Sequence, residues 1–318
     1  MIQALADGWN LDVEGLDYIA EGFGSYHWLA LDESGGRHFV TVDDLDQKGW
    51  LGIRRPTAFS GLRCAFDTAA VLRVQGHLDF VVAPVPSEDG DTVVRLGPHH
   101  TVAVFPYLDG QPARFGQGLE SDERAEAVHM LVELHQATPT VRALASDHHV
   151  ELSARRDLDG ALGQLETEWK GGPFSEPARA LLGAHRDAVI GLLAAFDRLA
   201  TEVATRSGDS VITHGEPHSG NVIRVGEKLF LVDWDTVALA PPERDLCMVA
   251  SETGDELALY FDLTGRAVDK AAMSLYCARW PLDDIALFVK MFRSTHATTD
   301  DTELAWLALT RHLGDVDG

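Results

Sequence analysis

The order of hydrophobic patterns along this chain constrains its fold more than any other feature. Short runs of β-type composition, bounded by Gly, Pro or Asp, fill the first third of the 318 residues, and such short spacings favour antiparallel hairpins. From residue 121 onward, apolar residues recur at helical spacing. Strands and helices therefore do not alternate, which excludes a doubly wound parallel sheet and predicts an α+β fold.

The expected elements follow from these patterns and their turn residues. The expected strands of the first third cover residues 18–22, 27–31, 38–42, 80–83, 92–96 and 101–105, with one helix at 57–75. The later expected helices cover 121–135, 176–205, 243–252, 255–262, 267–278, 282–294 and 299–313, interrupted by a hairpin at 222–232. We therefore expect a β-rich lobe at residues 1–106 and a larger, mostly helical lobe at 107–318.

Composition places the chain among intracellular globular proteins. It is 45% hydrophobic, enough for a sizeable core, and it contains no apolar run of membrane-spanning length. The first residues are acidic and do not resemble a signal peptide. Its cysteines, Cys64, Cys247 and Cys277, are far apart and form no metal-binding or disulfide pattern. We therefore expect a cytoplasmic protein with reduced thiols.

The net charge of −24 restricts the partners of this chain. A field of that sign repels nucleic acid and anionic lipid, so neither is an expected partner. The same field attracts cations and would raise the local concentration of a cationic small-molecule substrate. Solubility alone would also explain the charge, and the two explanations have equal weight.

The most informative segment runs from residue 211 to residue 245 and reads VITHGEPHSGNVIRVGEKLFLVDWDTVALAPPERD. A β-type run ends at Thr213, and Gly and Pro then make residues 214–217 a loop. The expected hairpin at 222–232 returns the chain to Asp233. The segment therefore places several polar side chains on loops that a hairpin brings back together.

Three of these side chains suit phosphoryl transfer to a hydroxyl group. Glu216 supplies a carboxylate that accepts or orients the hydroxyl proton. The amide oxygen of Asn221 and the carboxylate of Asp233 suit a hard cation such as Mg²⁺, held against nucleotide phosphates. A zinc site at His214 and His218 is disfavoured, because the helix that such a pair requires cannot form through Gly215 and Pro217.

The motifs of this segment resemble a known family. HGEPHSGN, followed by LVDWDT and PPERDL, is similar to the motif of the aminoglycoside phosphotransferases and choline-kinase-like enzymes, and VDWDT with APPERDL is most similar to the spectinomycin phosphotransferase branch. Weaker similarities lie in LVELHQAT, VFPYLDG and ARWPLDDIA. The resemblance implies a protein-kinase-like fold of two lobes, with ATP or GTP as co-substrate and Mg²⁺ as cofactor.

The resemblance also implies roles for individual residues. Glu216 takes the catalytic position and His214 is the motif histidine beneath its loop, while Asn221 and Asp233 bind the metal and Asp245 secures the loop. The residues expected at the nucleotide are Gly22, Gly24, Ser25 and Thr41, with Phe105 and Tyr107 in a hinge. The residues expected at the substrate are Asp235, Asp283 and Asp284, although a helix N-terminus also favours such acids.

Three positions depart from the family pattern. Glu216 replaces the usual Asp, which moves the carboxylate by about 1.5 Å. Thr41 stands where a strand lysine is expected, and the helix at 57–75 has no Glu to pair with such a lysine, only Asp67. The two absences are consistent, since the pair would be lost together. The phosphate charge then needs another cation, for which the candidates are Lys48, Arg54 and Arg55.

The sequence leaves three functions open. The first is transfer of the γ-phosphoryl group of ATP or GTP to a hydroxyl of a small molecule, with an aminoglycoside or related antibiotic as the favoured acceptor. The second is a metabolic kinase for an amino alcohol or a sugar. The third is a non-catalytic binding protein, which Thr41 and Glu216 motivate and which the retained Asn221 and Asp233 disfavour.

Overall fold

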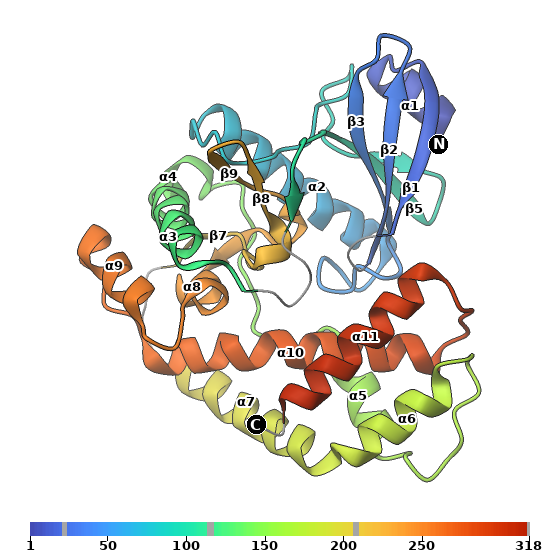
Figure 1. Ribbon diagram of the computed structural model, residues 1–318, viewed down its shortest axis with the longest axis vertical. Helices are drawn as coiled ribbons and strands as arrows, with labels where there is room; N and C mark the ends of the chain where they lie inside the picture. The colour runs from blue at the N-terminus through green and yellow to red at the C-terminus, as the bar shows by residue number, and fades with distance from the viewer. Residues whose placement is uncertain (21–23, 113–117, 206–209, 317–318) are drawn as a thin grey trace. The chain divides into compact units, whose positions relative to one another are not determined.

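The structure, a computed structural model, describes residues 1–20, 24–112, 118–205 and 210–316. The chain divides into two compact units (Figure 1). The first unit combines Met1–His148 with Gly208–Asp269, and the second combines His149–Ser207 with Lys270–Gly318. Each unit combines two separate stretches of the chain, so this division does not test the expected boundary between lobes at residues 106 and 107, which stays a prediction.

A five-stranded antiparallel sheet forms the N-terminal part of the first unit. In spatial order its strands are β1 (Val13–Ile19), β2 (Ser25–Asp32), β3 (Arg37–Asp44), β5 (His100–Pro106) and β4 (Val94–Leu96). Asp43 of β3 lies opposite Ser25 of β2 and Thr101 of β5. Because side chains alternate along a strand, these three residues share one face of the sheet with Thr41.

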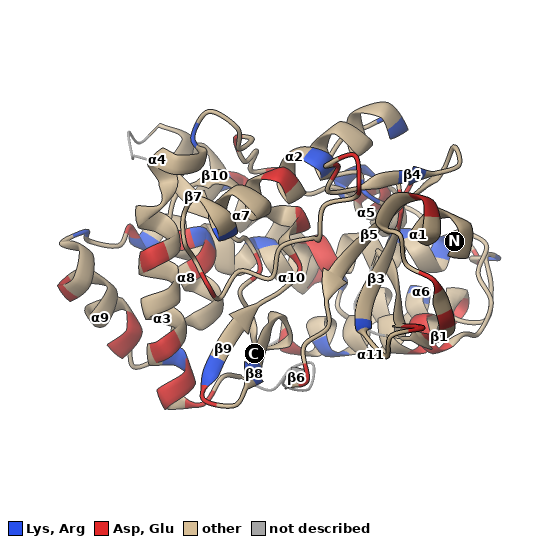
Figure 2. Ribbon diagram, turned by 90° about the horizontal axis from the view of Figure 1, so that it is seen from above, with Lys and Arg blue, Asp and Glu red and all other residues tan. Residues whose placement is uncertain are grey.

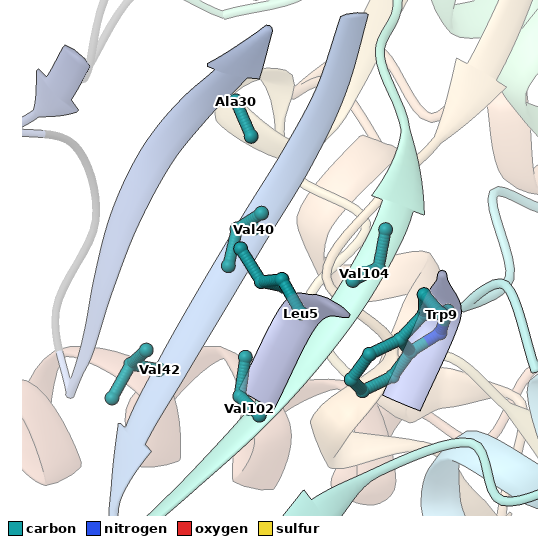
Figure 3. Close-up of a cluster of buried hydrophobic side chains, with 7 residues drawn as sticks. All are labelled: Leu5, Trp9, Ala30, Val40, Val42, Val102 and Val104. Carbon is teal, nitrogen blue, oxygen red and sulfur yellow. The ribbon is translucent and has the colours of Figure 1, made fainter. Parts of the chain in front are cut away.

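Two helices cover the two faces of this sheet. Leu5 and Trp9 of α1 (Ile2–Trp9) pack against Ala30, Val40, Val42, Val102 and Val104 (Figure 3). Leu62 and Phe66 of α2 (Arg55–Val74) pack against Ala103 and Phe105. The face under α2 is therefore the one that also carries Thr41 and Asp43.

The rest of the first unit carries the segment at 211–245. β7 (Val211–Thr213) pairs with β10 (Ala238–Ala240), and the hairpin of β8 (Val222–Val225) and β9 (Lys228–Leu231) pairs with β6 (Gln111–Pro112). The helices are α3 (Ser121–Gln136), α4 (Thr138–Val141), α8 (Glu243–Val249) and α9 (Asp255–Thr264), with 3₁₀ turns η1 (Ser219–Asn221) and η2 (Trp234–Thr236). α2 packs directly against η2, which ties the sheet to this segment.

The described part of the second unit consists of helices joined by loops and contains no strand. Its helices are α5 (Arg155–Leu162), α6 (Ser175–Ala184), α7 (Arg186–Ala204), α10 (Lys270–Arg293) and α11 (Asp300–Asp315). α7 and α5 both pack along α10. A cluster of stacked and edge-on rings from Phe174, Phe292, His296 and Trp306 joins α10 and α11 to the residues before α6.

Several expected elements differ from those observed. The helices expected at 267–278 and 282–294 are one helix, α10, which continues through Pro281. A proline removes one hydrogen bond from a helix, but Leu275 and Leu282 on either side of it stay fully buried, so packing outweighs this loss. The long helix expected at 176–205 is instead broken at His185 into α6 and α7.

Other differences concern the first third of the chain. Residues 80–83 form no strand, only an isolated bridge between Val81 and Leu231. β1 begins at Val13, earlier than expected, and α1 was not expected at all. The predicted α+β class is nevertheless confirmed by the antiparallel sheet and the helices that follow it. Among the described residues, no helix is long and apolar enough to cross a membrane.

The packing of α1 generates a stability prediction. Leu5 is fully buried against the sheet, whereas Ile2 on the same helix is 54% exposed. Leu5→Ala should lower the free energy of unfolding by about 2–5 kcal/mol, the usual cost of removing a buried leucine side chain. Ile2→Ala should change it by less than about 0.5 kcal/mol. Urea unfolding followed by circular dichroism would measure both, and equal losses would contradict the packing of α1.

Candidate active site

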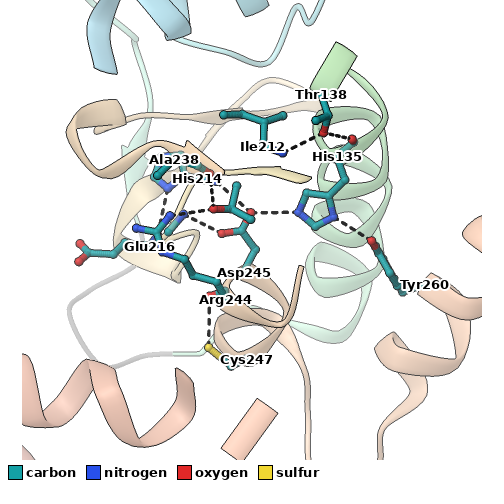
Figure 4. A network of polar contacts seen from close by, with 12 residues as sticks. His135, Thr138, Ile212, His214, Glu216, Ala238, Arg244, Asp245, Cys247 and Tyr260 are labelled. Carbon is teal, nitrogen blue, oxygen red and sulfur yellow. Dashed lines mark hydrogen bonds and ion pairs between the residues drawn. The ribbon is translucent and has the colours of Figure 1, made fainter. Parts of the chain in front are cut away.

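One carboxylate, that of Asp245, anchors the loop that follows β7. Asp245 Oδ2 accepts the backbone N–H of His214 at 2.9 Å, and Asp245 Oδ1 accepts that of Gly215 at 2.7 Å (Figure 4). Asp245 lies in the first turn of α8 and is fully buried. Both oxygens of one rigid helix residue thus fix two successive peptide groups of the loop that carries Glu216.

Asp245 is itself part of a chain of buried hydrogen bonds. His135 of α3 lies with Nε2 at 3.1 Å from Asp245 Oδ2, and its Nδ1 lies 2.9 Å from the hydroxyl of Tyr260 in α9. Burial opposes ionisation of Asp245, but the hydrogen bond and charge of His135 and the charge of Arg244 outweigh it and lower the pKa of Asp245. The carboxylate therefore stays ionised, so both of its oxygens can accept hydrogen bonds.

Arg244 supports the same loop from the neighbouring position. Its guanidinium donates to Thr213 Oγ1 and to the carbonyl oxygen of Thr236, each at 2.8 Å. Gly215 lies directly against this guanidinium with φ of +105°, and a Cβ atom there would overlap it. Only glycine fits this position, because it tolerates both the left-handed backbone and the close approach.

The His214 ring connects the loop to the end of β9. Its Nε2 lies 2.9 Å from the carbonyl oxygen of Val232, and its Nδ1 accepts the backbone N–H of Glu216 at 3.2 Å. These partners place the ring proton on Nε2. The edge of the ring meets Trp234 at 4.6 Å between centroids. Burial lowers the pKa of His214 to about 4, so the ring is neutral at physiological pH.

Asn221 closes the loop on its other side. Its Nδ2 donates to the backbone carbonyl of Glu216 at 2.9 Å, and its backbone carbonyl accepts from Val232 at 3.0 Å. Since the amide nitrogen is held at Glu216, Oδ1 is the atom of Asn221 that can coordinate a cation. The Glu216 carboxylate itself points away from the Asp245 network (Figure 4).

Asp233 lies between Val232 and the first residue of η2, Trp234. Its φ of 64° and ψ of 69° are left-handed, an uncommon backbone state for a residue other than glycine. The residue as a whole keeps solvent-exposed surface, although protein atoms surround its carboxylate. The surrounding protein limits hydration of the carboxylate and raises the pKa of Asp233, the neighbouring Asp235 and Asp43 raise it further, and Lys48 opposes them. Negative charge is therefore in excess around Asp233.

Two buried acids next to this position share one buried lysine. Lys48 Nζ lies 2.9 Å from Asp43 Oδ1 and 2.6 Å from Asp235 Oδ2. Lys48 was one of the three cations expected from the sequence, whereas Asp43 was not expected. Its only sequence signal is an acidic residue near the end of β3, a strand that also carries Arg37, His38, Thr41 and Asp44. Asp235 was expected at the substrate, and the structure places its carboxylate on Lys48.

The residues expected at the nucleotide lie along the sheet and its end. Gly24 has a left-handed φ of 84°, Ser25 Oγ donates to Asp43, and Thr41 is buried beside His27. Phe105 is buried against Phe66 in the core. Two expected residues remain, Tyr107 and Gly22. The Arg37 guanidinium lies 4.5 Å from the centroid of the Tyr107 ring, and Gly22 lies outside the described residues.

Asp283 and Asp284 both lie in the second unit and both have partners there. Asp283 Oδ1 accepts the backbone N–H and the hydroxyl of Ser153, each at 2.8 Å, and Arg279 donates to its other oxygen at 3.0 Å. Asp284 lies 2.9 Å from His312 Nε2. Their expected contact with a substrate stays a prediction, because these bonds by themselves explain both side chains.

The site fits a magnesium ion in its chemistry. Among the described residues, no group of three or more His, Cys, Asp or Glu side chains is arranged to hold a metal. Asn221 Oδ1 and the Asp233 carboxylate are oxygen donors of the kind Mg²⁺ prefers, and Mg²⁺ commonly takes one or two protein ligands with phosphate oxygens and water. The excess negative charge around Asp233 would be offset by such an ion.

Comparison with known proteins agrees with this geometry. A model of a phosphotransferase enzyme family matches residues 19–276. This match covers most of the chain, so the protein belongs to that family, and the predicted class of enzyme, a phosphotransferase acting on an alcohol group, is confirmed. No curated protein matches the chain in sequence.

Solved structures of similar fold include enzymes with different acceptors. Spectinomycin phosphotransferase APH(9)-Ia, in complex with ADP and spectinomycin, has a TM-score of 0.73 at 16% identity, covering 100% of this chain and 96% of that chain. Amicoumacin kinase hAmiN, in complex with AMP-PNP, Ca²⁺ and Ami, has 0.62 at 15%, covering 99% and 91%. The microcompartment-associated aminopropanol kinase has 0.57 at 16%, covering 99% and 95%. The predicted kinase-like fold is therefore confirmed.

The contact between Gly215 and Arg244 generates a second prediction. Gly226 in the β8–β9 turn also has positive φ, but nothing lies within 4 Å of a Cβ added there. Gly226→Ala should therefore cost only the left-handed strain, roughly 1–2 kcal/mol of unfolding free energy. Gly215→Ala should cost clearly more, about 3 kcal/mol or above, because Arg244 must also move. Equal costs in urea unfolding would contradict the contact.

The buried ring of His214 generates a prediction of pH dependence. Its folded pKa of about 4 lies below the ordinary value near 6.5. Between these values the unfolded chain binds a proton that the folded chain excludes, so stability is complete above about pH 6.5 and falls as the pH approaches 4. Urea unfolding of the wild type at several pH values should show this loss.

A pair of variants tests the assignment of that loss. His214→Gln should make the decline between pH 6.5 and 4 shallower without abolishing it, because burial also lowers the pKa of His218 to about 4. The variant should be less stable at pH 7, because the contact with Trp234 is lost. The exposed His149 offers a matched control, and His149→Gln should leave the slope unchanged. An undiminished slope in His214→Gln would show that another group is responsible.

Proposed function

We propose that this protein transfers the γ-phosphoryl group of ATP or GTP to a hydroxyl of a small, cationic molecule. The observation that carries the proposal is the loop fixed on Asp245, which presents Glu216 and Asn221 next to Asp233. All of these residues belong to the first unit and are connected by hydrogen bonds through Val232. Their order and chemistry agree with the family to which the chain belongs.

Each residue of the loop has one proposed role. Glu216 orients the acceptor hydroxyl and takes its proton, since its carboxylate points away from the buried network. His214, neutral and buried, keeps the Glu216 peptide in place. Asn221 and Asp233 would hold Mg²⁺, which neutralises phosphate charge during transfer.

The nucleotide is proposed to bind along the sheet of the first unit. The expected contacts are the turn at Gly24 and Ser25, the face that carries Thr41, and the backbone near Phe105 and Tyr107. Phe105 and Thr41 are buried, so a nucleotide would meet the backbone more than these side chains. ADP and AMP-PNP occupy two of the proteins with a similar fold, which supports a nucleotide co-substrate.

The acceptor is proposed to be an antibiotic or a related amine, which would make the protein a resistance enzyme. The net charge of −24 favours a cationic acceptor, and Figure 2 shows acidic residues along helices such as α3 and α9. Asp283 and Asp284 remain the proposed substrate contacts of the second unit. An amino alcohol is the second candidate, because an aminopropanol kinase shares the fold.

The proposed location is the cytoplasm, where nucleoside triphosphates are supplied. The three cysteines, Cys64, Cys247 and Cys277, form no disulfide bond, which fits a reducing compartment. The third possibility from the sequence, a non-catalytic binding protein, is disfavoured by membership in a phosphotransferase family and by the intact Asn221 and Asp233.

Phosphorylation of a panel of acceptors tests the proposal. The purified protein would be incubated with Mg·ATP or Mg·GTP and with spectinomycin, aminoglycosides, macrolides and simple amino alcohols, and mass spectrometry would detect the phosphorylated product. We expect at least one antibiotic to be phosphorylated. Phosphorylation of amino alcohols alone would favour the metabolic alternative, and nucleotide binding without any product would favour the binding protein.

Replacement of the proposed base generates the fourth prediction. Glu216→Gln should lower kcat by about 10²–10⁴-fold, the usual contribution of a general base. The dissociation constant of the nucleotide should be nearly unchanged, because Glu216 faces the acceptor. Glu227→Gln offers a matched control, since Glu227 is exposed in the β8–β9 turn of the same segment. Full activity of Glu216→Gln would refute the role of Glu216.

A further inference from the structure

One lysine is buried among acidic side chains of the first unit. Lys48 is 1% exposed, and its ammonium lies within 3 Å of both Asp43 and Asp235. A buried charge is unfavourable unless it is paired and hydrogen-bonded. The two carboxylates satisfy this requirement, and with the nearby Asp233 they leave the cluster negatively charged. Pairing therefore explains why the buried ammonium is tolerated, but the surplus of negative charge in the cluster is left uncompensated.

The two partners of Lys48 come from distant parts of the chain. Asp43 lies on β3, on the face of the sheet covered by α2, and Asp235 lies in η2, two residues after Asp233. Both belong to the first unit. The ammonium therefore bridges the sheet expected to bind the nucleotide and the turn expected to bind the metal, where the phosphates of a nucleotide would lie.

The turn at Gly24 lies next to the same ammonium. Lys48 Nζ donates to Ser25 Oγ at 2.8 Å, and Ser25 Oγ donates to Asp43 at 2.7 Å. A Cβ atom on Gly24 would lie 3.9 Å from Lys48 Nζ and 3.3 Å from Trp50. An ammonium beside a glycine turn is an arrangement suited to a phosphate group.

Trp50 adds an independent observation at this cluster. Its ring lies 5.1 Å from Lys48 Nζ, within the range of a cation–π interaction. Its indole Nε1 is buried and has no hydrogen-bond partner among the described residues. Buried N–H groups are normally paired, so this donor is left for the oxygen of a ligand.

The other two candidate cations, Arg54 and Arg55, do not contact this cluster. Arg55 donates to Asp46 at 2.7 and 2.8 Å on the surface, and Arg54 is an exposed residue at the start of α2. Asp67, the one acid that α2 offered as a partner for a lysine, instead accepts from Thr92 at 2.7 Å. Of the three candidates, Lys48 alone lies in the cluster.

We propose that Lys48 contacts the nucleotide phosphates in place of the lysine absent at Thr41, and that Asp43 is the residue that positions it. This inference rests on the proposed function. An ammonium has three N–H donors, and here they serve Ser25, Asp43 and Asp235. A phosphate oxygen can therefore bind the ammonium only if it displaces one of these three partners. In the proposed exchange the displaced partner is Asp235, and its carboxylate is released beside Asp233.

Titration calorimetry with adenosine, AMP and ADP in Mg²⁺ buffer tests the inference by binding rather than by activity. The test variant is Lys48→Met with Asp43→Asn, which removes one positive and one negative charge together and so leaves the net charge of the cluster unchanged. Its affinity for ADP should fall about ten- to hundredfold, the range for one charge-assisted hydrogen bond, while its affinity for adenosine stays unchanged. The matched control, Arg55→Met with Asp46→Asn, should bind all three ligands as the wild type does.

The outcomes separate the inference from the function on which it rests. If the double variant keeps the wild-type ratio of ADP to adenosine affinity, the assignment of Lys48 is overturned and the proposed function is unaffected. If the wild type binds neither ADP nor ATP, the proposed function fails as well.

Asp235→Asn gives a second test that does not depend on folding of the double variant. It removes the competitor of the phosphate and leaves Lys48 paired with Asp43. The ratio of ADP to adenosine affinity should rise several-fold, and should do so only where Lys48 is present. An unchanged or lower ratio would overturn the proposed exchange.

Discussion

The acceptance of two backbone N–H groups by Asp245 is the interaction on which the site depends. The loop after β7 contains Gly215 and Pro217 and has no regular structure that would fix it. Asp245 supplies the missing constraint from α8, because both of its oxygens bind successive peptide groups at 2.9 and 2.7 Å. His135 and Tyr260 keep this carboxylate in place, so three helices determine the position of Glu216.

A second buried carboxylate system complements the first. Asp245 and His135 form a network in which every charge is satisfied, and it fixes a loop. Lys48, Asp43 and Asp235 form a network with more negative than positive charge, next to Asp233. A satisfied buried network provides rigidity, whereas an unbalanced one favours the arrival of a cation. The Asp245 network is therefore suited to holding the loop in place, and the Lys48 network is suited to binding a ligand.

Much of the site was predictable because its residues are close in sequence. Glu216, Asn221 and Asp233 lie within one segment whose turns and hairpin are encoded locally by Gly and Pro. Asp43 was not predictable, since its importance depends on Lys48, and Lys48 itself could not be separated from Arg54 and Arg55. Asp67 had the composition of a partner for the lysine, yet it bonds Thr92. Such pairings depend on distances that no local pattern contains.

The sequence by itself determined the α+β class, the family resemblance, and the order of loop and hairpin around the site, because short-range turn chemistry and hydrophobic periodicity encode them. Only the tertiary structure decided that α10 continues through Pro281, since packing on both sides outweighs one lost hydrogen bond. It also decided which cation meets Asp235, 187 positions away from Lys48 along the chain. Electrostatic partners are chosen by proximity in the folded chain, and that proximity exists only after β3 and η2 have been brought together.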